Sequence, residues 1–96
     1  MVAKPTYRID GARFNDLEGF YDQVESQVLG GKRWGRNLDA LNDAMAGEFG
    51  GLHREFRLEW VNSRLSEARL VQAGTGGFAD LVQIIRGHPN VELVLL

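Results

Sequence analysis

Asp39 and Asp43 are two residues whose type and spacing could act on another molecule. They are separated by four positions, so on a helix both carboxylates would project from one face. Carboxylates presented in this way form strong, charge-assisted hydrogen bonds with cationic side chains of a partner. Acids are also common on solvated surfaces, and an acid in the first helical turn gains from the helix dipole. The residues around the pair must therefore decide between a binding role and an ordinary place on the solvated surface.

The sequence offers little for catalysis. Its histidines are His53 and His88, and neither lies near a serine or an aspartate in a known nucleophile motif. There is no glycine-rich phosphate loop, no cysteine, and no spacing of histidines and acids that would hold a metal ion. We therefore expect no enzyme activity, no metal and no cofactor.

The composition indicates a single globular domain over residues 1–96, with 44% hydrophobic and 25% charged residues. Its formal net charge of −2 argues against general nucleic-acid binding, which usually needs a basic surface. No apolar run is long enough to cross a membrane, and no apolar stretch near the N-terminus resembles a signal sequence. Together with the absence of cysteine, this predicts a cytoplasmic protein.

The charges are unevenly distributed along the chain, which matters more for partners than the total does. Residues 15–31 contain no Lys or Arg but hold four acids, Asp16, Glu18, Asp22 and Glu25. The basic residues Lys32, Arg33 and Arg36 then follow together.

Hydrophobic spacing predicts strands and helices in the order β-α-α-β-α-α-β. Strands are expected over residues 6–9, 55–60 and 91–96. In the second strand, Phe56, Leu58 and Trp60 alternate with charged residues and are expected to face the core. The last strand is almost wholly apolar, which suits a strand covered on both faces or one deep in the sheet.

An apolar stripe predicts the first helix, with Asn15 or Asp16 as its cap. The stripe consists of Phe14, Leu17, Tyr21, Val24 and Val28. Later helices are expected over 65–71 and 78–86. Because helices separate the strands, we expect parallel pairing with right-handed crossovers.

The second helix is predicted over residues 38–46, with Asn37 as its N-cap and Gly47 as its stop. Its buried stripe would consist of Leu38, Leu41 and Met45. Its other face would carry the remaining polar and small side chains, Asp39, Asn42, Asp43 and Ala46.

The residues from Trp34 to Asp43 read Trp-Gly-x-Asn-Leu-Asp-Ala-Leu-x-Asp, where x is any residue. This segment resembles the binding segment of the barstar family, whose pattern is aromatic-Gly-x-Asn-Leu-Asp-Ala-Leu-x-Asp with a later glycine closing the helix. The similarity extends to the strand Leu58-Glu59-Trp60, to residues 81–86 and to the apolar C-terminal strand. The resemblance therefore covers nearly the whole chain.

The resemblance implies an α/β fold, a small three-stranded parallel sheet packed with about four helices. It also implies an intracellular inhibitor of a secreted guanyl-specific ribonuclease, a monomer that forms a 1:1 complex, with neither nucleic acid nor membrane as partner. Asp43 would be the central anchor in the enzyme's active site and Asp39 would take a flanking cation, so that both substitute for RNA phosphates. The remaining residues of the binding surface would be Arg33, Trp34, Gly35, Asn37, Asn42 and Ala46.

Some of these residues also have simpler roles. We expect Asn37 to act as a helix cap more than as a contact, and Gly35 to serve the loop geometry. Trp34 is expected to be partly buried with an exposed edge.

The sequence departs from the family at several positions. Arg33 stands where barstars have an aromatic residue, Asn42 also replaces an aromatic, and Ala46 replaces a hydroxyl residue. Gly87 stands where the family has a glutamate that reaches the enzyme.

The basic loop from Lys32 to Arg36 leaves other functions open. It predicts a more acidic target than usual, with Arg33 and Arg36 meeting carboxylates around its cleft. One alternative is a small nucleic-acid-binding module in which this loop tracks phosphates and Trp34 stacks on a base. Another is an adaptor that keeps the barstar fold but binds a different enzyme.

Overall fold

The computed structural model describes residues 4–46, 55–72 and 77–96. Three strands, β1 (Thr6–Asp10), β2 (Phe56–Val61) and β3 (Val91–Leu95), form one sheet in the order β1-β2-β3. Both pairings are parallel, with Ile9 opposite Trp60 and Trp60 opposite Leu95. The predicted parallel α/β architecture is confirmed.

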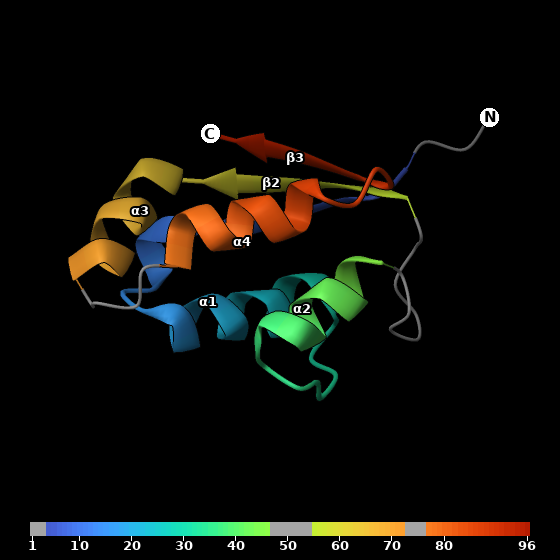
Figure 1. The fold of residues 1–96 in the computed structure, drawn as a ribbon, viewed down its shortest axis with the longest axis horizontal. Coiled ribbons are helices and arrows are strands. Elements are labelled where there is room, and N and C mark those ends of the chain that lie inside the picture. The colour runs from blue at the N-terminus through green and yellow to red at the C-terminus, as the bar shows by residue number, and fades with distance from the viewer. Residues whose placement is uncertain (1–3, 47–54, 73–76) are drawn as a thin grey trace.

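Four α-helices pack with this sheet: α1 (Leu17–Gln23), α2 (Leu38–Met45), α3 (Ser63–Gln72) and α4 (Gly77–Arg86). A short 3-10 helix (Gly11–Arg13) precedes α1, and a π-helical segment (Val24–Val28) continues it. Figure 1 shows α1, α2 and α4 on the same side of the sheet, with α3 beyond the carboxyl ends of the strands.

The core lies between the sheet and these helices. Phe56, Leu58 and Trp60 are fully buried, as the alternation in their sequence predicted. The Trp60 indole N–H donates to Ser66 Oγ at 2.9 Å, which satisfies the polar atom of the largest core side chain. Phe20, which lay outside the predicted apolar stripe, packs against Trp60 with ring centroids 5.2 Å apart.

The outer face of the sheet carries a ladder of charges in place of a second helical layer. Glu59 on β2 pairs with Arg8 on β1 at 2.8 Å and with Arg57 at 3.1 Å. Glu92 on β3 pairs with Arg57 at 3.0 Å and with Lys4 at 2.9 Å. Hydrogen bonds from Arg8 and from Lys4 hold the pKa values of Glu59 and Glu92, respectively, below the usual range.

Three details of the predicted elements are wrong. Leu38 does not belong to the buried stripe of α2; its side chain is 40% exposed, and Ala44 is buried beside Leu41 and Met45 instead. Phe14, which the predicted stripe included in the first helix, precedes that helix with an extended backbone. Asp16, one of the two expected caps, is the N-cap of α1, so that prediction is confirmed. The C-terminal strand lies at an edge of the sheet, because the order β1-β2-β3 puts β2 in the middle.

The prediction that Gly47 ends the second helix concerns a position outside the described residues.

Candidate functional site

The site predicted from the sequence lies on α2 and on the loop that enters it. The π-helical segment ends at Gly30 and Gly31, whose φ values of 64° and 83° are left-handed and favour glycine. The chain then runs through residues 32–36 and enters α2 at Asn37.

Asn37 is the N-cap of α2, as predicted. Its side-chain Oδ1 accepts a 2.7 Å hydrogen bond from the Ala40 N–H, and its backbone oxygen accepts one from the Leu41 N–H. Gly35 lies against the same turn, where a Cβ atom would come within 2.8 Å of the Ala40 Cβ. The glycine thus lets the loop pack directly on the helix, in agreement with its predicted role in loop geometry.

Trp34 holds the loop against the body of the protein. It is partly buried, and its ring meets Tyr21 edge-to-face with centroids 5.4 Å apart. Its indole Nε1 is buried and has no hydrogen-bond partner among the described residues. Burial also raises the pKa of the Tyr21 hydroxyl.

Asp39 and Asp43 are exposed side chains on one face of α2. Within residues 4–46, 55–72 and 77–96, neither carboxylate has an ion pair or a side-chain hydrogen bond. Asn42 and Ala46 are exposed beside them. α2 therefore presents two carboxylates to solvent that are available to cations of another molecule.

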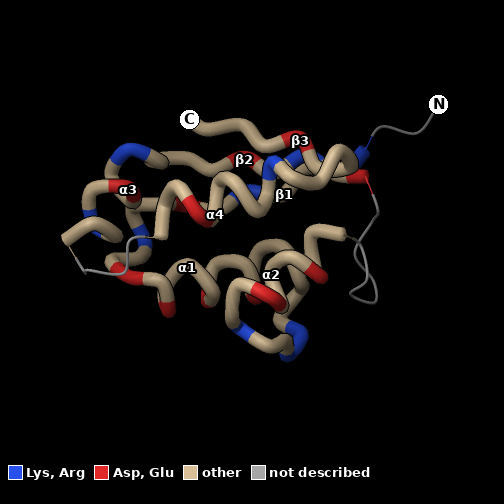
Figure 2. Tube along the Cα trace, in the orientation of Figure 1, with Lys and Arg blue, Asp and Glu red and all other residues tan. Residues whose placement is uncertain are grey.

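The basic loop divides into residues that face solvent and one that does not. Lys32 and Arg33 are exposed. Figure 2 shows that the loop entering α2 carries basic positions close to the acidic positions of that helix. Arg36 instead turns to the first helical region, where it contacts carboxylates of Glu18, Asp22 and Glu25. The hydrogen bonds that Arg36 donates, chiefly to Asp22 and then to Glu18, raise the pKa of its guanidinium further above its already high usual value.

Arg36 is the feature that sequence reasoning missed. We expected its guanidinium to meet carboxylates of a target, but those of its own chain occupy it. The spacing of Glu18, Asp22 and Glu25 at steps of four and three, in a stretch without Lys or Arg, was the signal that could have identified the contact.

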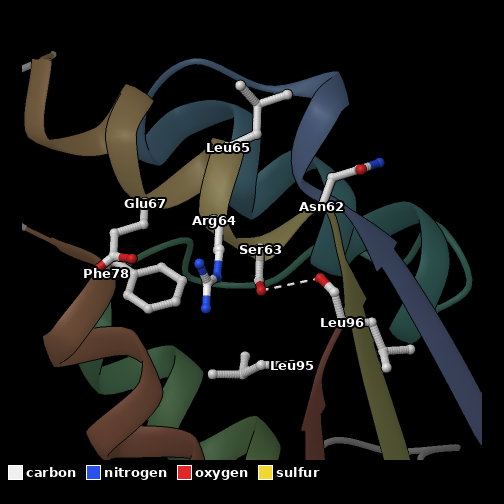
Figure 3. A pocket seen from close by; sticks show the side chains of 8 residues that line it. All are labelled: Asn62, Ser63, Arg64, Leu65, Glu67, Phe78, Leu95 and Leu96. Atoms are coloured by element: carbon white, nitrogen blue, oxygen red, sulfur yellow. Dashed lines mark hydrogen bonds between the residues drawn. The ribbon is translucent and has the colours of Figure 1, made fainter.

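The hollow between α3 and the end of β3 belongs to a different part of the molecule. Figure 3 shows its lining side chains, among them Phe78, Leu95 and Leu96, with Ser63 Oγ donating to the Leu96 oxygen at 3.0 Å. None of the predicted site residues lines it. In the described ranges, no three His, Asp or Glu side chains gather as a metal site would require. Nor does any helix in those ranges combine the length and the apolarity needed to span a bilayer.

A comparison with protein families identifies the family of this chain. Residues 4–88 fit the sequence model of a family described as Barstar (barnase inhibitor). That span contains the whole of α2 and its entering loop, as well as β1, β2, α3 and α4. No curated protein matches the chain.

Proposed function

Because the chain belongs to the barstar family, whose members inhibit barnase-like ribonucleases, we propose that it blocks the active site of a secreted guanyl-specific ribonuclease with the carboxylates of α2. Members of this family are inhibitors rather than enzymes. The proposal also keeps the expected cytoplasmic location and the expected 1:1 complex with a monomeric inhibitor.

The observation that carries the proposal is the state of Asp39 and Asp43. Both are exposed, lie one turn apart on a capped helix, and have no cationic partner in the described part of the chain. A ribonuclease binds the phosphates of RNA with positively charged side chains, so its cleft offers complementary partners. Rigid carboxylates occupying those positions would mimic RNA without offering a bond to cleave.

We assign the central position to Asp43 and the flanking one to Asp39. Around them, Asn42, Ala46, Gly35 and Arg33 would complete the contact surface, since all are exposed. Trp34 and Asn37 would contribute mainly by holding the loop and the helix in place.

An RNA-cleavage assay tests the proposal. The purified chain is titrated into a panel of secreted guanyl-specific ribonucleases, and cleavage of a labelled RNA is followed. We expect at least one enzyme to be inhibited stoichiometrically, with inhibition lost in the double variant D39A/D43A. If no enzyme of the panel is inhibited at micromolar concentration, the proposed function is wrong.

A further inference from the structure

The backbone of the entering loop turns at Arg36 through a conformation that arginine disfavours. Its φ is 53°, in the left-handed region that glycine and asparagine tolerate best. Among the described residues, Asn62 is the one other non-glycine residue with a positive φ. Since arginine brings no intrinsic preference for this turn, the surrounding structure must hold it there, and the contacts of its side chain are part of that structure.

Those contacts are with the first helical region. Arg36 Nη2 lies 2.6 Å from Asp22 Oδ1 and 2.9 Å from Glu18 Oε2, and Nη1 lies 3.4 Å from Glu25 Oε1. Nη2 also donates to the Glu18 backbone oxygen at 3.3 Å. The Arg36 side chain is 27% exposed, whereas those of Glu18 and Asp22 are 74% and 69% exposed, so water screens these two pairs from the carboxylate side. The pair with Glu25 is the least exposed, at 31% for the carboxylate side chain.

Because Arg36 directly precedes the cap of α2, its contacts act on the start of that helix. The preceding residues are fixed by Trp34 on Tyr21 and by Gly35 on Ala40. The next residue, Asn37, is the cap from which α2 begins. The guanidinium therefore joins the start of α2 to a surface of α1 and the π-helical segment.

We propose that Arg36 is a positioning residue of the inhibitory surface, and that its contacts with Glu18, Asp22 and Glu25 fix the direction in which Asp39 and Asp43 project. The inference rests on the proposed function, because it concerns the same two carboxylates. Holding them in one orientation before the encounter reduces the conformational freedom lost on binding. The acids of α1 also neutralise Arg36, so its charge does not compete with a partner for Asp39 and Asp43.

Amide hydrogen exchange tests the positioning without any partner. In Arg36→Asn the backbone can keep its left-handed turn, but the ion pairs are lost. We expect the Ala40 and Leu41 amides, which bond to Asn37, to exchange at least about tenfold faster, while amides of β2 keep their rates. Arg64→Asn, at an exposed arginine on α3, is the control of equal charge and should leave α2 unchanged. Exchange of Ala40 and Leu41 within about twofold of the parent would overturn the inference.

A charge exchange distinguishes the ion pair from a general effect of substitution. Arg36→Asp and Asp22→Arg should each speed exchange at α2, whereas the double variant restores a pair of similar combined length. Aspartate also tolerates the left-handed backbone. We expect the double variant to return to within about threefold of the parent. A double variant as fast as Arg36→Asp alone would contradict the assigned contact.

A separate inhibition assay measures whether Arg36 affects binding to a ribonuclease. With a ribonuclease that the parent inhibits, Arg36→Asn should weaken inhibition at least about tenfold, and the charge exchange should restore most of it. If exchange at α2 speeds up but inhibition is unchanged, Arg36 holds the loop without positioning the carboxylates, and the inference fails. If the parent inhibits no ribonuclease, the proposed function fails, while the exchange data still decide whether Arg36 fixes α2.

Discussion

At the scale of single residues, Asp43 is expected to contribute the most to binding. Asp43→Ala should weaken the complex by more than about 2 kcal/mol, which is roughly 30-fold in Kd. This magnitude is the one typical of interface hot spots in general, and a barstar aspartate is an extreme example of them. The fold should survive because the side chain is exposed. Inhibition titrations and thermal unfolding measure the two effects.

Asp80→Ala is the matched control for that experiment. Asp80 is an exposed acid in the first turn of α4, so its loss changes net charge equally without touching α2. Equal inhibition by Asp43→Ala and by Asp80→Ala would show that Asp43 is not the anchor.

Much of the candidate site could be predicted from local sequence. Asn37 as a cap and the exposure of Asp39 and Asp43 follow from spacing within one short helix. The role of Arg36 could not be predicted in this way. Its partners lie 11 to 18 residues earlier on another element, and its turn has a backbone angle that arginine seldom adopts.

At the scale of elements, the start of α2 depends on its cap. Asn37→Ala removes the acceptor of the Ala40 N–H and should lower the free energy of unfolding by about 1 kcal/mol. Urea denaturation measures the loss. Asn37→Ser keeps a capping oxygen and should recover most of the stability, whereas equal stability of Asn37→Ala and the parent would show that the cap contributes little.

The elements that were predicted correctly have a strong hydrophobic periodicity within their own segment of the sequence. Alternation placed Phe56, Leu58 and Trp60 in the core, because one face of β2 meets the helices. β3 was misjudged because its apolar composition suggested a covered strand, whereas Leu96, just beyond it, is 57% exposed. Strand order depends on contacts between distant segments, so composition alone could not supply it.

At the scale of the whole molecule, charge should govern the approach of the ribonuclease. Exposed acids on α2 facing a cationic cleft accelerate the encounter, and salt screens that attraction over about 10 Å at 0.1 M. The association rate should therefore fall as salt rises, with a smaller effect on dissociation. Stopped-flow binding at several salt concentrations tests this. An association rate independent of salt would argue against a steered encounter.

Stability should fall in acid because of the charged ladder on the outer face of the sheet. The folded-state pKa values of Glu59 and Glu92 lie below their ordinary 4.5, so near and below that pH the unfolded chain binds more protons. The contribution of these groups is complete above about pH 5 and is lost as pH falls through the lowered pKa values. Denaturation at a series of pH values measures the change.

Glu59→Gln should reduce stability at neutral pH and flatten the acid dependence, because the pairs with Arg8 and Arg57 are lost. Glu67→Gln is the control, at an exposed glutamate without an ion-pair partner in the described ranges. An equally steep acid dependence in Glu59→Gln and the parent would show that the ladder does not set the pH response.

Competition with a nucleotide tests the central claim most directly. Binding of this chain to an inhibited ribonuclease would be measured while guanosine 3′-monophosphate is raised to saturation. If carboxylates of α2 occupy the phosphate positions, the two ligands exclude each other and the apparent Kd rises in proportion to the nucleotide. An apparent Kd that stays constant at saturating nucleotide would mean that the chain binds elsewhere and that Asp39 and Asp43 do not substitute for phosphates.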